Sequence, residues 1–157
     1  MVLLSMDFYI PPFERKLFAG PDGKMDMGKI EASYDKEVLD ELRAYPGLIW
    51  KIWAIEDDGK HGSGYYLFAD AHAAEVRKKF AEKFYNFKGM FFVKCKIRTV
   101  IEGCSEYNKA PIHLPANPPM TLEQEELILH PKLENPIKLL NHKKQLIRKY
   151  EKGLAKQ

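Results

Sequence analysis

The sequence predicts an α+β fold of the ferredoxin-like type: a four-stranded antiparallel sheet with two helices on one face. Three observations favour it. The elements follow the order β-α-β-β-α-β, the connections between them are short, and crossovers between strands are right-handed as a rule. With 157 residues, 45% of them apolar and 30% charged, the chain has the composition of one globular domain with an appendage.

The first half of the expected domain begins with a strand. Apolar and polar residues alternate over residues 2–9, which is the period of a half-buried strand. Residues 11–26 hold three prolines and two glycines, so we expect an inserted surface loop there. Apolar residues at helical spacing predict one helix over 27–45, ended by the Pro-Gly pair that follows.

The second half begins with the segment PGLIWKIWAIEDDGKHGSGYYLFAD, which predicts an antiparallel hairpin. Its strands are expected at 48–56 and 65–69, joined by a polar, Gly-rich turn. Asp70 is a good N-cap for a helix over 71–85. A last strand is expected over 90–102, which completes the element order.

The sheet has a second face whose composition predicts a partner. We expect Trp50, Ile52 and Ala54 to face the helices, which places Lys51 and Trp53 on the opposite face. That face also carries the charged side chains of the last strand (Lys94, Lys96 and Arg98). Because a large aromatic on a solvated face usually indicates that the face is covered, we expect a homodimer that stacks two sheets. A monomer with a solvated face is the alternative.

The chain is expected to divide into a domain over 1–110 and an extension over 111–157. The extension starts with a Pro-rich linker, and the capping-box pattern Thr121-x-x-Gln124 predicts a short helix. A longer amphipathic helix is expected after Asn135-Pro136.

Charge is distributed unevenly along the chain. Residues 136–157 carry a net charge of +6, and the rest of the chain sums to −3. A basic tail on a slightly acidic body does not favour a nucleic-acid-binding fold. The tail helix could bind a membrane surface or a partner helix, but packing on the body or the other subunit is favoured, so a membrane partner is not expected.

Other classes of protein lack support in the sequence. Cys95 and Cys104 have no CxxC spacing, which argues against a disulfide framework and a zinc site and favours a reducing compartment. No apolar run approaches the roughly 20 residues of a membrane span, and the start lacks a signal peptide's basic region. We expect a cytoplasmic protein with no metal and no cofactor, since nucleotide, metalloprotease and serine-hydrolase motifs are missing.

Three segments resemble a known family. PGLIWKIW, the GSGYYLFAD that follows it, and VIEGCSEYNKA are similar to the signature segments of the YdhR-like monooxygenase family, a branch of the dimeric α+β barrels. The resemblance covers residues 2–10 and 27–110. It implies a homodimer whose sheets close a barrel, and a pocket between each sheet and its helices for small aromatic or polyketide-like ligands. The insertion at 11–26 and the C-terminal extension depart from the family pattern.

The resemblance also implies a class of chemistry, because the wider group includes cofactor-free oxygenases, cyclases and isomerases. A cofactor-free oxygenase must bind an electron-rich ring, take up its proton and stabilise the anion. Aromatic side chains suit the walls, and histidine has an unperturbed pKa near neutrality. The candidate substrate-binding residues are Trp50, Tyr34, Tyr66 and Phe80. The candidate catalytic residues are His72, His61 and Tyr66.

Each candidate also has a structural interpretation. Trp50 and Tyr66 could simply pack in the core, and both histidines occupy positions where exposed residues are common. A closed cavity lined by Trp50 and Tyr66 would favour an enzyme. A solid core there would favour a non-catalytic binding or assembly module.

Overall fold

The predicted fold class is confirmed by a computed structural model, which describes residues 1–84 and 93–131. Within these residues the strands form one antiparallel sheet in the order β2-β3-β1-β4, which is the ferredoxin-like order. The strands are β1 (Val2–Tyr9), β2 (Leu48–Ile55), β3 (His61–Phe68) and β4 (Val93–Thr99).

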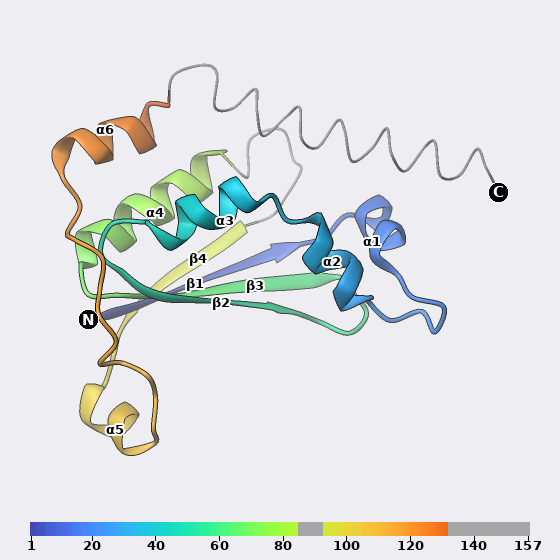
Figure 1. The fold of residues 1–157 in the computed structure, drawn as a ribbon, viewed down its shortest axis with the longest axis horizontal. Helices are drawn as coiled ribbons and strands as arrows, with labels where there is room; N and C mark the ends of the chain where they lie inside the picture. The colour runs from blue at the N-terminus through green and yellow to red at the C-terminus, as the bar shows by residue number, and fades with distance from the viewer. Residues whose placement is uncertain (85–92, 132–157) are drawn as a thin grey trace. The chain divides into compact units, whose positions relative to one another are not determined.

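The described residues also form helices. They are α1 (Pro12–Phe18), α2 (Met27–Ser33), α3 (Lys36–Arg43), α4 (Ala71–Phe84), α5 (Glu102–Tyr107) and α6 (Leu122–Leu129). Helix α4 packs on β4, β1 and β3, and α3 packs on β2. We call the face under α3 and α4 the inner face; α5 lies on the side of the other, outer face (Figure 1).

The core forms between the inner face and α4. Leu4 of β1, Phe68 of β3 and Val76 of α4 are fully buried. The side chain of Asp70 caps α4 by accepting a hydrogen bond from the backbone N–H of His72 at 2.9 Å, as the sequence predicts. The apolar side chains of β1 and those of the apolar stripe of α4 therefore pack against each other, as the sequence predicts.

The insertion at 11–26 is not the loop that we expected, because it contains α1. Prolines disfavour helix interiors, but Pro12 occupies the first turn, where its fixed φ is compatible with a helix and its missing N–H costs no bond. The insertion is anchored to the β2–β3 turn. The backbone N–H of Met25 donates to the carbonyl of Asp57 at 3.3 Å, and the Met25 side chain lies against Gly59.

The single helix expected over 27–45 is also a correction, since two short helices replace it. Tyr34 adopts an extended conformation with ψ of 130°, which ends α2. Asp35 then starts α3 by accepting a hydrogen bond from the backbone N–H of Glu37 at 2.9 Å. An aspartate favours the N-cap position over a helix interior, because at the N-cap its side chain can accept a hydrogen bond from a free backbone N–H group. The break turns the Tyr34 ring onto Trp53.

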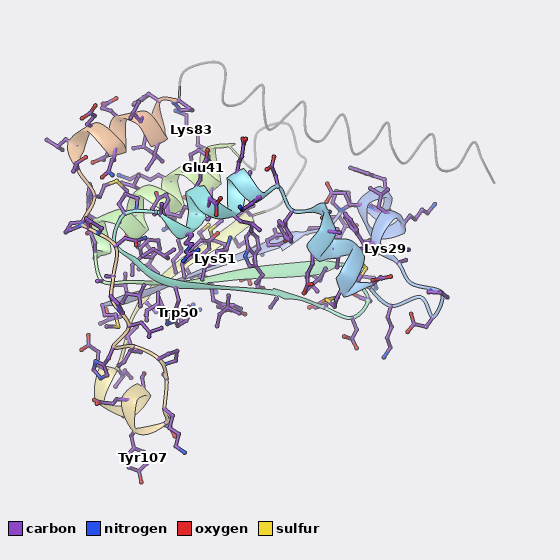
Figure 2. All side chains as sticks on the ribbon, viewed as in Figure 1. Lys29, Glu41, Trp50, Lys51, Lys83 and Tyr107 are labelled. Carbon is purple, nitrogen blue, oxygen red and sulfur yellow. The ribbon has the colours of Figure 1, made fainter. Side chains whose placement is uncertain are left out.

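The most consequential correction concerns the faces of β2. The pairing between β2 and β3 shifts between Leu48 and Trp50, so that Leu48 pairs with Phe68 and Trp50 with Leu67. One extra residue in a strand moves every following side chain to the other face. Lys51 and Trp53 consequently lie on the inner face, and Trp50, Ile52 and Ala54 on the outer face. In Figure 2 Lys51 lies on the side of α3, and Trp50 on the opposite side.

Strand β3 is longer than predicted, because it begins at His61 and includes the Gly-Ser-Gly sequence that we placed in the turn. The strand β4 that the structure describes is shorter than the expected 90–102. It ends at Thr99, and α5 follows from Glu102. Residues 90–92 lie outside the described residues.

The residues up to Thr121 form one compact unit, and a second unit begins at Leu122. The predicted linker belongs to the first unit because it is hydrogen-bonded there. The backbone N–H of Asn117 donates to the carbonyl of Leu48 at 2.9 Å, and its side-chain amide donates to the carbonyls of Arg43 and Tyr45, both at 2.8 Å.

In the second unit, α6 begins directly after Thr121, as the capping-box pattern predicts. The helix expected after Asn135 lies outside the described residues. Among the helices that the structure describes, none combines the length and hydropathy needed to cross a membrane.

Asn117 provides a test of how firmly this segment is attached. Because its amide satisfies two carbonyls at the end of α3, Asn117→Ala should lower the free energy of unfolding by about 1–3 kcal/mol. Urea denaturation measures this loss. Asn108→Ala, which removes one exposed bond at the end of α5, is the matched control and should change stability by less. Equal effects would contradict the anchoring role.

Candidate active site

The inner face of the hairpin carries an amine enclosed by aromatic rings. Lys51 and Tyr66 are cross-strand partners on β2 and β3, so their side chains emerge side by side. The Nζ atom of Lys51 lies 2.9 Å from the centroid of the Trp53 ring and 4.5 Å from that of Tyr66. It is buried and has no hydrogen-bond partner among the described residues.

A second cation reaches the same tyrosine from the helix layer. Arg77 of α4 is only 6% exposed, and its Nη2 atom donates to the hydroxyl of Tyr66 at 3.5 Å. The guanidinium carbon also lies 5.6 Å from the centroid of the Tyr66 ring and 5.2 Å from that of Phe80. Tyr66 therefore joins the amine and the guanidinium in one cluster.

Tyr34 completes the cluster. Its ring lies 4.9 Å from the Trp53 ring, centroid to centroid. Tyr34 and Trp53 are 37% and 40% exposed, so the cluster reaches solvent on this side. We call Tyr34, Lys51, Trp53, Tyr66, Arg77 and Phe80 the inner-face cluster.

Glycines of β3 make room for these side chains. A Cβ atom at Gly64 would lie 3.0 Å from the ring of Tyr66 and 3.6 Å from the Cε of Lys51. At Gly62 it would lie 2.5 Å from the ring of Phe8. The Gly-Ser-Gly sequence thus leaves the inner face open beside Lys51, while Ser63 points outward and donates to Asp7 at 2.7 Å.

Burial and the nearby Arg77 charge lower the pKa of Lys51 to about 5. The two aromatic faces act in the opposite direction, because they attract an ammonium by about 0.5–2 kcal/mol. Removing an ammonium from water costs several kcal/mol, which is roughly twice the attraction of the two aromatic faces or more. Burial therefore prevails, and Lys51 is a neutral amine at pH 7.

Burial raises the pKa of Tyr34, and the nearby Tyr66 and Glu14 raise it further. Tyr34 thus keeps its proton at neutral pH and can donate a hydrogen bond. Since Glu14 lies on α1, the inserted segment contributes to the electrostatics of the cluster.

Three of the four expected substrate-binding residues, Tyr34, Tyr66 and Phe80, come together in this cluster. Trp50 does not, because it lies on the outer face, where its Nε1 atom donates to the carbonyl of Pro111 at 3.2 Å. Trp50 and Tyr66 therefore do not line one pocket within a single chain.

His61 lies apart from the cluster. It is exposed at the start of β3, about 16 Å along the strand from Tyr66. Its Nδ1 atom lies 3.0 Å from the Glu56 carboxylate, and its ring meets Tyr9 edge to face at 6.0 Å.

His72 lies in the first turn of α4 and is exposed. It borders an open groove of about 590 Å³ whose other lining residues are Gly47, Ala69, Asp70, Ala116, Asn117, Pro119 and Met120. Asp70 is already engaged there by the backbone N–H groups of His72 and Met120.

Sequence reasoning missed Lys51, Trp53 and Arg77 as site residues. Arg77 could have been found, because it lies four residues after Ala73 and three before Phe80 on the buried stripe of α4. A charged residue at such a position indicates a buried polar site. In the part of the chain that the structure describes, no three His, Cys, Asp or Glu side chains are grouped so as to hold a metal ion.

The sheet order and the inner-face cluster define a ferredoxin-like α+β protein with an aromatic site that contains an amine. The chain belongs to the YdhR family: the family model described as "Putative mono-oxygenase ydhR" matches residues 23–111, more than half of its length. The predicted family is thereby confirmed.

No curated protein matches the chain. Among solved structures, the chain is similar to a dimeric ferredoxin-like protein from an uncultured marine organism, with 13% identity and a TM-score of 0.37. That similarity covers 64% of this chain and 95% of the other.

The neutral state of Lys51 predicts a pH-dependent effect of its removal. Between its folded pKa of about 5 and its unfolded pKa of roughly 10.4, the unfolded chain binds a proton that the folded chain does not. Folding is therefore penalised at low pH, and the penalty disappears as the pH rises towards 10. Lys51→Met should raise the free energy of unfolding by up to roughly 6 kcal/mol at pH 6, and this gain should fall by about 1.4 kcal/mol for each pH unit up to pH 9.

Urea denaturation at pH 6, 7.5 and 9 measures this gain. Lys79→Met, on the exposed side of α4, is the matched control and should show no such trend. A gain that is the same at all three pH values would show that Lys51 is charged in the folded state.

Proposed function

We propose that this protein is a cofactor-independent monooxygenase that acts on a phenolic or polyketide-like aromatic substrate at the inner-face cluster. The observation that carries the proposal is a neutral amine enclosed by Trp53 and Tyr66 next to the buried cation Arg77. Such a site can take up a proton and then hold the anion that results. The family description supports oxygenase chemistry in general.

The roles of the residues follow from their chemistry. Tyr34, Trp53 and Phe80 provide flat walls for a ring at little cost in rotamer entropy. Lys51 accepts the proton of an acidic phenol or C–H group. The ammonium formed, together with Arg77 and the Tyr66 hydroxyl, stabilises the substrate anion. Lys51 takes the place of the histidines expected from the sequence.

The anion then reacts with molecular oxygen. For an anthrone-type substrate, the ring CH₂ group becomes a carbonyl. One oxygen atom enters the product, and the other leaves as water with the two hydrogens of the CH₂ group. The substrate supplies all the electrons, so the balance requires no further reductant.

Activity can be tested with dithranol, an anthrone that gains a quinone absorbance when oxidised. Lys51→Met should lower kcat about 10²–10⁴-fold, because it removes the proton acceptor. Tyr66→Phe should lower it about 10²-fold or more, which corresponds to about 3 kcal/mol for a lost anion donor, with a smaller effect on KM. Oxygen uptake and absorbance, both corrected for autoxidation, measure these rates.

The matched control is the double variant His61→Ala with His72→Ala, which should oxidise dithranol at the wild-type rate. Loss of activity in this variant, with Lys51→Met still active, would return the base to the histidines. Wild-type protein that does not accelerate oxidation of anthrones or related phenols would contradict the oxygenase proposal.

A second candidate function follows from the same amine. Proton uptake by Lys51 and anion binding by Arg77 need no oxygen, so the cluster also fits a cyclase or isomerase. Exchange of substrate C–H for deuterium under anaerobic conditions, without oxidation in air, would favour this candidate.

We also propose that the protein is a homodimer formed through the outer face. Ile52 is 51% exposed at the centre of β2, next to Tyr65 of β3. Lys96 and Arg98 of β4 lie on the same face, and their apolar stems can cover a second sheet. In the sequence, Trp53 is an argument for the dimer. In the structure, Trp53 does not support it, because its side chain lies on the inner face.

Ile52→Glu should convert the dimer to a monomer of 18.2 kDa, because it places a charge in an apolar contact. Sedimentation equilibrium at micromolar concentration measures the mass. Lys79→Glu on the exposed side of α4 is the control and should leave the dimer intact. A monomeric wild-type protein would overturn the proposal.

A further inference from the structure

The position of Lys51 gives it a reactivity beyond proton transfer. A primary amine attacks carbonyl carbons only in its neutral form, and most protein amines are protonated at pH 7. The Lys51 amine is buried, has no hydrogen-bond partner among the described residues, and lies against the rings of Trp53 and Tyr66. Its lone pair is thus not committed to a strong hydrogen bond.

We propose that Lys51 condenses with aromatic aldehydes and ketones to form an imine in the inner-face cluster. The carbonyl carbon forms a bond to Nζ and loses its bond to oxygen. The two protons of the amine leave with that oxygen as water, so the step requires no oxidant or reductant. This activity goes beyond the proposed oxygenase function and does not depend on oxygen.

Neighbouring groups fit each stage of the condensation. The Tyr34 ring lies 4.9 Å from the Trp53 ring, centroid to centroid, so its protonated hydroxyl is a candidate hydrogen-bond donor to the departing oxygen. The aromatic walls favour an aryl carbonyl over an aliphatic one. Burial limits the water that would hydrolyse the imine.

Arg77 further restricts the class of ligand. Its guanidinium and Lys51 Nζ both lie against the ring of Tyr66, at 5.6 and 4.5 Å from the centroid. A hydroxyl ortho to the carbonyl would keep its proton and donate it in a hydrogen bond to the imine nitrogen, while its oxygen would accept a hydrogen bond from this cation. We therefore expect 2-hydroxyaryl carbonyl compounds to bind in preference to unsubstituted ones.

Reductive trapping tests the inference on the full chain. The wild-type protein is incubated anaerobically at pH 6.5 with 2-hydroxybenzaldehyde and cyanoborohydride, digested and mapped by mass spectrometry. At this pH a surface lysine is neutral in only about one molecule in 10⁴. We expect Lys51 to carry the hydroxybenzyl group at least tenfold more often than any other lysine, and benzaldehyde to label it more slowly.

Two variants define the outcome. Lys51→Arg should lose the preferential label, whereas Lys79→Arg on the exposed side of α4 should keep it. A wild-type map in which Lys51 is unlabelled, or labelled no more than surface lysines, overturns the inference, and this holds even if a variant fails to fold. Because trapping is anaerobic, this result is independent of dithranol oxidation, which tests the proposed oxygenase function separately.

Discussion

The irregular pairing between Leu48 and Trp50 is the constraint on which the candidate site depends. The strand contains one extra residue relative to β3. Each side chain from Trp50 to Trp53 therefore lies on the face opposite to the one it would occupy in a regular strand. Lys51 and Trp53 enter the space beneath the helices, and Trp50 and Ile52 face outward. Without the bulge, Lys51 would lie on the outer face, away from Arg77.

The backbone at this point is itself held by tertiary contacts. Gly47, just before the bulge, has φ of +67°, which L-residues with side chains rarely adopt. A Cβ atom there would lie 2.5 Å from that of Asp70, so the close approach of the hairpin to α4 also requires glycine. Its N–H donates to the carbonyl of Pro118 at 2.8 Å. The Pro-Gly signature thus sets the path of the strand that carries Lys51.

The class of fold could be predicted from the sequence because it depends on local patterns. The alternation of β1 and the Asp70 cap of α4 are each contained in a few residues, and both occur where predicted. The faces of β2 could not be predicted in this way. The bulge depends on pairing with β3 and on contacts with residues near 117, which are distant in the sequence. The same applies to the break at Tyr34, where packing of its ring against Trp53 favours an end to the helix that the local pattern does not require.

The candidate site was harder to predict because its chemistry depends on burial. An unperturbed pKa near neutrality favours histidine as the base, and regular alternation along the strand predicts Lys51 on the outer face. In the structure, His61 and His72 are exposed. Lys51 is buried, and its burial beside Arg77 lowers its pKa so far that it loses its proton.

A buried amine of this kind opposes folding at neutral pH, so packing alone does not account for a lysine at this position. A methionine would fill similar volume without that cost. The cost is explained if the neutral amine performs a reaction, because strain and unfavourable burial persist where function requires them. The stability and trapping measurements therefore examine two sides of one property: the free energy that the amine costs the fold, and the reactivity that it gives the site.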